Sequence, residues 1–89
     1  MPSEADVFID TITERLLSIR GRGLMMSPAD WLVMNDWWDR RIPLHVITEC
    51  MDEAEARGVR PRNLRYFVPA VDEAWRQVLD MQGLEEAGR

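Results

Sequence analysis

The 89-residue sequence has a single cysteine, no lysine and no long apolar run. One cysteine, Cys50, cannot form an internal disulfide, which excludes a disulfide-stapled scaffold and favours a reducing compartment. The absence of lysine excludes P-loop and Schiff-base chemistry. No apolar run approaches the roughly 20 residues that a membrane helix needs, and the first residues are acidic where a signal peptide is basic and then apolar. We therefore expect a cytoplasmic protein without a membrane span.

Charge and residue types also limit the chemistry. Sixteen acidic residues against eleven arginines give a net charge of −5, which disfavours a surface that binds nucleic acid throughout. His45 and Cys50 lie about 140° apart around a helix, so they cannot share a metal ion. The sequence also has no Ser-His-Asp set, no HExxH, no glycine-rich phosphate loop and no EF-hand pattern. We expect no catalytic residue, no cofactor and no metal ion, and hence a protein that is not an enzyme.

Apolar spacing predicts one all-α domain over residues 1–89, a bundle of four main helices. The first helix, about 4–20, has a Ser3 and Asp6 capping pattern and ends at the Arg20–Gly23 segment. The second, about 28–40, starts at Ser27-Pro28, where Ser caps and Pro takes the first helical position. The third, about 43–57, ends at Gly58.

The fourth helix is interrupted by a proline. Apolar spacing from Leu64 runs to about residue 82, but Pro69 sits too deep in that segment to be accommodated without cost. Two alternatives stay open, a kink at Pro69 or one helical turn over 64–67 followed by a new helix at Pro69. We expect residues 1–3 and 84–89 to fray at the ends of the domain.

The second helix has a wider apolar arc than one helix-helix contact requires, about 160°. Trp31 and Trp38 fit the core side of this arc, as Trp75 does in the fourth helix, whereas Trp37 lies at its edge. We predict that Trp37 is uncovered and anchors a protein interface, because exposed aromatic side chains favour association. The predicted interface consists of Trp37, Val33, Leu32 and Arg41.

An arginine cluster supports a second interpretation. Arg57, Arg60, Arg62 and Arg65 lie around the junction of the third and fourth helices, and Arg76 projects on the same side of the fourth helix as Arg65. Beside the free N–H groups at the start of the fourth helix, these guanidinium groups would suit phosphate. The alternative is that they pair with acidic residues of the third helix and complement its dipole.

Residues 27–75 resemble the DnaD-like domain of bacterial and phage replication-initiation proteins. The matching features are Ser27-Pro28-x-Asp30-Trp31, Ile47 with Ala54 and Ala56, Gly58, and Phe67-x3-Val71-x3-Trp75. The resemblance implies an all-helical module that binds DNA and self-associates. The same stretch is similar to small uncharacterised bacterial proteins with SPxDW, IPLxV and LRYxxPAVxEAW runs, a similarity that implies no function.

Two functional hypotheses follow from the sequence. The first is a non-catalytic adaptor or assembly module that binds another protein, or a second copy of itself, through the aromatic edge of the second helix. The second is a DNA-binding module that uses the arginine cluster, as the DnaD-like resemblance implies, although the negative net charge disfavours it.

Overall fold

The helix starts follow the capping signals in the sequence. A computed structural model describes residues 3–20 and 26–87. Helix α1 (Glu4–Arg20) begins with a reciprocal pair in which the Asp6 N–H donates to Ser3 Oγ and the Ser3 N–H donates to Asp6 Oδ2, both at 3.2 Å. Ser3 is therefore the capping residue of this helix. Helix α2 (Pro28–Asp39) begins with the same reciprocal capping pair, formed by Ser27 and Asp30. Helix α3 (Leu44–Ala56) begins directly after Pro43. The residues expected to stop α1, 21–23, lie outside the described part of the chain.

The segment around Pro69 adopts the second of the two predicted arrangements. A 3-10 turn, η1 (Leu64–Phe67), is followed by helix α4 (Val68–Ala87), whose first turn contains Pro69. Backbone N–H groups in the first turn of a helix have no acceptor within the helix. The missing N–H of a proline at this position therefore costs no hydrogen bond. Helix α4 continues to Ala87, so our prediction that the fourth helix ends at about residue 82 is wrong. The aperiodic Glu- and Ala-rich end still forms helix because these residues have high helix propensity.

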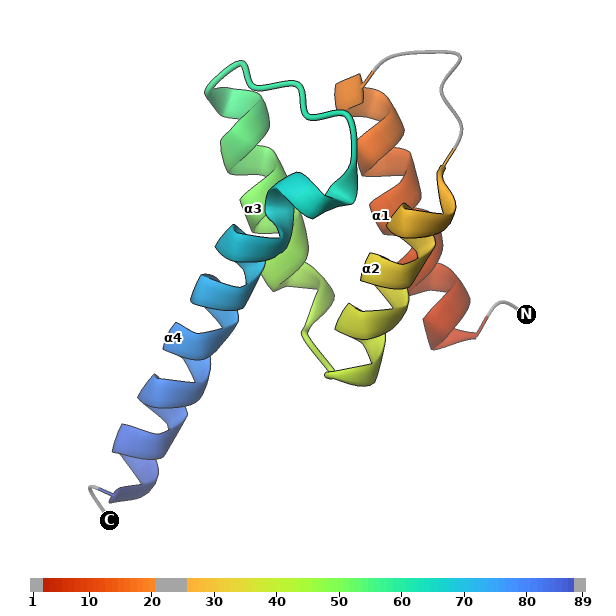
Figure 1. Cartoon of the computed structure of the whole chain (residues 1–89). Helices are drawn as coiled ribbons and strands as arrows, with labels where there is room; N and C mark the ends of the chain where they lie inside the picture. Colours follow the sequence, from red (N-terminus) through yellow and green to blue (C-terminus); the bar gives the residue numbers. More distant parts are fainter. Residues whose placement is uncertain (1–2, 21–25, 88–89) are drawn as a thin grey trace.

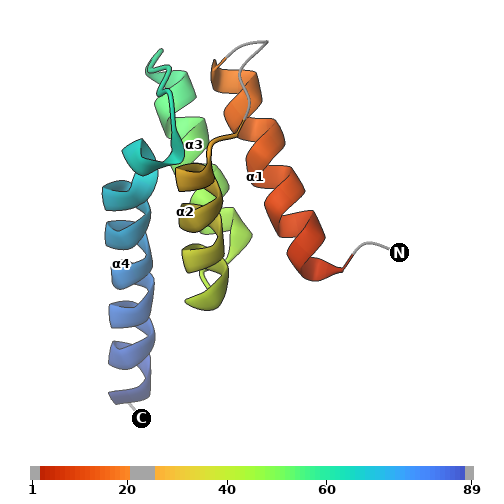
Figure 2. The same cartoon turned by 45° about the vertical axis from the view of Figure 1, so that its right-hand side comes forward.

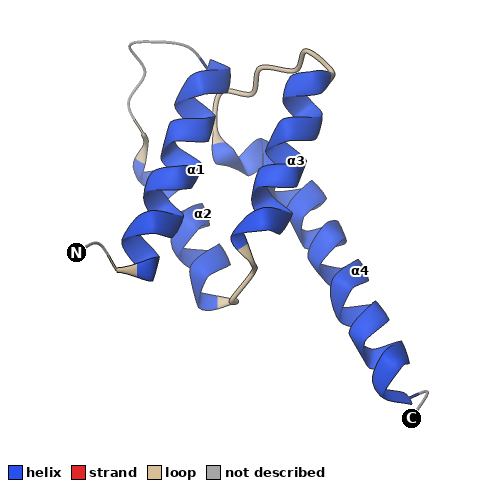
Figure 3. Cartoon of the chain, turned by 180° about the vertical axis from the view of Figure 1, so that it is seen from behind, coloured by secondary structure: helices blue, strands red, loops and turns tan. Residues whose placement is uncertain are grey.

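The four helices form the predicted all-α fold, and no strand occurs among the described residues (Figures 1 and 3). Helix α1 packs against α2 and α3, η1 packs on α2, and α4 packs on α3. Much of α4 extends beyond the other three helices (Figure 2). No helix in the described part of the chain has the length and hydropathy to cross a bilayer. The core is made of Phe8, Ile12, Leu16, Ile19, Met34, Trp37, Ile42, Val46, Ile47, Met51, Ala54, Leu64, Phe67 and Val71.

Helices α2 and α3 end in the same hydrogen-bond pattern. At the end of α2, the Ile42 N–H donates to the Trp37 carbonyl and the Arg41 N–H to the Trp38 carbonyl. Val59 and Gly58 repeat this pattern at the end of α3. In both helix ends, the residue that leads from the helix into the loop has a left-handed backbone. This residue is Arg41 after α2, with φ 58°, and Gly58 after α3, with φ 75°. Glycine adopts this conformation freely, whereas arginine does so at a cost.

The rotation of α2 about its axis differs from our prediction. Trp37 is 0% exposed, so its predicted exposure is wrong, while Trp31 and Trp38, predicted in the core, are 43% and 38% exposed. The reason is Asp30, which is fully buried and whose Oδ1 accepts the N–H of Leu64 at 2.9 Å. Because positions seven apart share one side of a helix, this bond also turns Trp37 toward η1 and into the core.

Candidate functional site

The first candidate site is a groove lined by residues from the first turns of α1, the end of α2 and the start of α3. Its volume is about 630 Å³. We call it the aromatic groove. Its apolar lining comprises Val7, Phe8, Trp38, Ile42, Pro43 and Leu44, and its charged residues are Glu4 and Arg41.

The base of the groove is a pair of aromatic rings. The rings of Phe8 and Trp38 meet edge to face, with their centroids 5.2 Å apart and their planes at 65°. Phe8 is buried in the core, whereas Trp38 stays partly exposed beside the exposed Val7. The Phe8 ring therefore packs against one part of the Trp38 indole, and another part of the indole surface stays accessible for contact.

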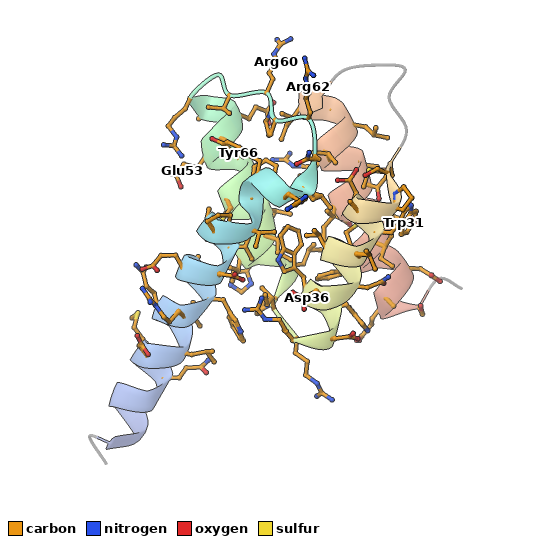
Figure 4. All side chains as sticks on the ribbon, in the orientation of Figure 1. Trp31, Asp36, Glu53, Arg60, Arg62 and Tyr66 are labelled. Atoms are coloured by element: carbon orange, nitrogen blue, oxygen red, sulfur yellow. The ribbon has the colours of Figure 1, made fainter. Side chains whose placement is uncertain are left out.

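A second exposed indole extends this surface along α2. Trp31 precedes Trp38 by seven residues, so both lie on the same side of the helix. Figure 4 shows the Trp31 side chain pointing away from the helical body. The exposed edge predicted at Trp37 is therefore wrong, because Trp37 is buried, and the exposed indoles of α2 are Trp31 and Trp38, which were predicted in the core.

The predicted interface residues do not form one site. Arg41 lines the aromatic groove. Leu32 is 70% exposed, as predicted, and together with the half-buried Val33 it lines a separate groove of about 420 Å³ between α2 and the start of α4. Trp37 lines neither groove because it is enclosed in the core.

Sequence reasoning missed Val7, Phe8 and Leu44 as groove residues. The sequence assigned Phe8 and Leu44 to buried helix faces. In the structure Phe8 is buried in the core and Leu44 is half buried against it. No local sequence pattern marks either residue as part of a groove. Val7 did carry a signal, because it is an apolar residue outside the apolar stripe of α1 and is exposed. The other signal was the spacing of Trp31 and Trp38, which places two indoles on one side of α2.

The arginine cluster is only partly assembled. Arg60 and Arg62 extend from the loop before η1 into solvent (Figure 4), and Arg65 is also exposed. No carboxylate among the described residues forms an ion pair with these three arginines. Arg57 instead pairs with Glu53 at 3.7 Å, and Arg76 of α4, eleven residues after Arg65 of η1, pairs with Glu73.

The predicted phosphate cradle at the start of the fourth helix is partly filled by the chain itself. The N–H of Leu64 donates to the buried Asp30 carboxylate, so this donor does not face solvent. Asn63, which precedes the turn, makes no side-chain capping bond. Asp30 thus takes the place that an anion would occupy at this N–H.

The remaining reactive side chains are separate from one another. His45 is exposed, and Cys50 is half buried on α3. Burial, with a smaller effect from the charges of Glu53 and Glu49, raises the pKa of the Cys50 thiol and so favours its unreactive protonated form. Within residues 3–20 and 26–87, no three His, Cys, Asp or Glu side chains are arranged to hold a metal ion.

Comparison with known proteins gives no assignment. No family model matches the chain, and neither a curated protein nor a solved structure is significantly similar to it.

Proposed function

We propose that this chain is a non-catalytic protein-interaction module that binds an apolar segment of another protein in the aromatic groove. The observation that carries the proposal is the partly exposed Trp38 indole, held edge to face on the buried Phe8 ring inside a groove of about 630 Å³. Fixed aromatic side chains with free surface are the usual energetic centres of protein interfaces.

The edge of the groove fits the same function. Glu4 and Arg41 place one negative and one positive side chain beside the apolar lining. Interfaces commonly combine an apolar centre with a polar rim, whose charges select the orientation of the partner. We therefore expect a partner segment with an aromatic or long aliphatic anchor and charged flanks.

The backbone of Arg41 gives separate support. Its left-handed conformation is one that glycine adopts more easily, as Gly58 does at the matching position after α3. Strained backbone positions are concentrated at functional sites. An arginine in this position directs a long cationic side chain to the edge of the groove, which glycine would not provide.

A peptide-display selection tests this function. Peptides enriched on the folded chain are expected to contain an aromatic or long aliphatic anchor. Both W38A and V7D should weaken their binding at least tenfold, about 1.4 kcal/mol. The matched control is L32A, which removes an exposed apolar side chain of α2 outside the groove and should leave affinity unchanged. Enriched peptides that bind W38A and V7D as tightly as the wild type would contradict the proposal.

DNA binding is the second candidate function. It is favoured by the solvent-directed Arg60 and Arg62 and by the resemblance of residues 27–75 to the DnaD-like domain. If it is correct, affinity for duplex DNA falls steeply with salt, and R60A/R62A lowers the salt slope by about two. Binding that is absent at low salt excludes this function.

A further inference from the structure

A second apolar groove follows the seam between α2 and the start of α4. Its volume is about 420 Å³, and its apolar lining is Ala29, Leu32 and Val33 of α2 and Val68 of α4. Val33 and Val68 are partly buried against the core, whereas Leu32 is 70% exposed. The groove, which we call the Leu32 groove, therefore offers one largely uncovered apolar side chain beside two that pack against the core.

The lining of the Leu32 groove includes an unpaired positive charge. Arg65 of η1 lines the groove and is exposed. Within residues 3–20 and 26–87, no carboxylate forms an ion pair with its guanidinium group. This group is therefore available to a carboxylate of a partner that also covers Leu32.

The other end of the seam is closed by ion pairs. Asp36 and Asp72 follow the groove residues of α2 and α4 by one helical turn. Arg40 binds both carboxylates, with N–O distances of 3.3 Å to Asp36 and 2.7 Å to Asp72. Two carboxylates against one guanidinium group leave a net negative charge at this end. An acidic residue of a partner is therefore favoured at Arg65 and disfavoured at Asp36.

Positive charge is concentrated around the Arg65 end of the groove. The sequence between Glu55 and Asp72 contains four arginines and no acidic residue, in a chain whose net charge is −5. Arg62, three residues before Arg65, extends into solvent from the loop that leads into η1 (Figure 4). A local positive field in an acidic molecule attracts acidic segments and repels basic ones.

We propose that the Leu32 groove binds an acidic protein segment, in which a long aliphatic side chain lies next to a carboxylate. The aliphatic side chain packs on Leu32, Val33 and Val68, and the carboxylate forms a charge-assisted pair with Arg65. The Leu32 groove shares no lining residue with the aromatic groove, so this inference does not depend on the proposed function.

The surroundings of Arg65 favour this carboxylate over the phosphates of nucleic acid. The N–H of the neighbouring Leu64 donates to the buried Asp30 carboxylate at 2.9 Å, so it cannot join Arg65 in holding a phosphate. A nucleic-acid backbone also has no aliphatic side chain that would cover Leu32. An acidic peptide uses both the charge and the apolar lining of the groove.

Two peptide libraries of opposite charge test the inference. Both have an aliphatic residue at the centre, flanked by Asp and Glu in one library and by Lys and Arg in the other. The selection uses the W38A chain, so that peptides of the aromatic groove are not enriched. We expect enrichment from the acidic library alone. L32S and R65Q, at two exposed positions, should each weaken binding at least about tenfold.

Two variants outside the groove are the matched controls. The side chains replaced in W31S and R60Q are exposed, and neither lines the Leu32 groove. Each control should change peptide affinity less than about threefold at physiological salt, because exposed charges beyond contact distance are largely screened. R65E should reverse the preference, so that peptides flanked by Lys and Arg bind more tightly than acidic ones.

The inference is overturned if the acidic library gives no enriched peptide, or if acidic peptides bind L32S and R65E as tightly as the parent W38A chain. It is also overturned if R65Q lowers the affinity for duplex DNA and leaves peptide affinity unchanged, since Arg65 then belongs to a phosphate site.

Discussion

The buried Asp30 carboxylate connects two segments that are far apart in the sequence. Its Oδ2 accepts hydrogen bonds from the Ser27 N–H and hydroxyl, and its Oδ1 accepts the Leu64 N–H. The capping role was readable from the Ser27 spacing, but the bond to Leu64 was not, because no local pattern indicates a partner 34 residues away. The burial of Trp37 was unpredictable for the same reason.

Trp37 should make a large contribution to stability. Replacing it with Ala should lower the free energy of unfolding by about 3 to 5 kcal/mol, because a fully buried indole leaves a cavity. W37F should cost less, about 1 to 2 kcal/mol, since the indole N–H has no acceptor among the described residues. The exposed Trp31 provides the control, and W31A should cost less than about 1 kcal/mol. Urea denaturation measures all three, and W37A and W31A of equal stability would contradict the observed burial.

The reactivity of Cys50 should depend on pH in a defined direction. Burial raises the pKa of its thiol in the folded state, so the unfolded chain releases this proton at lower pH. Below about pH 8.5 the thiol is protonated in both states and does not change the free energy of unfolding. As the pH rises from there toward the folded pKa, the unfolded chain loses the proton first, so the free energy of unfolding falls. Iodoacetamide labelling should show a rate midpoint at higher pH in the native chain than in urea. A native midpoint at or below the unfolded one would contradict this.

At the scale of the helices, the capping and breaking signals predicted most of the fold. Ser3, Ser27, Gly58 and Pro69 each mark a boundary that the structure confirms to within one or two residues. These signals act within one helical turn, so a single sequence contains them. The end of α4 was mispredicted because the sequence has no comparable stop after residue 82. The aromatic groove could not be predicted, because three helices contribute to it and their relative rotation is set by long-range packing.

The two matching helix ends provide a paired prediction. R41G should stabilise the fold by about 1 kcal/mol, because glycine relieves the left-handed backbone at φ 58°. It should also weaken binding of a groove peptide through loss of the cationic side chain. G58A should destabilise the fold by about 1 kcal/mol through backbone strain alone, since no atom lies within 4 Å of the added methyl group. Thermal melts check both variants, and an R41G chain that is less stable than the wild type would contradict the assignment.

At the scale of the whole molecule, the aromatic groove is separate from the half of α4 that extends beyond the other three helices. L79E/M81E, at two exposed positions of that half, should therefore leave the affinity for a groove peptide unchanged, because distant independent sites have additive effects. Titration with the display-selected peptide measures this, and a loss of affinity as large as that of W38A would contradict the separation of the two surfaces.

The most direct test of the central claim is an isotope-filtered NOE measurement on the labelled chain with an unlabelled peptide from the display selection. We predict intermolecular NOEs from the peptide to the Trp38 indole, the Val7 methyl groups and the Leu44 methyl groups, which line the aromatic groove. NOEs that connect the peptide instead to Leu32 and Val33, or to Leu79 and Met81, would contradict the assignment of this groove as the binding surface.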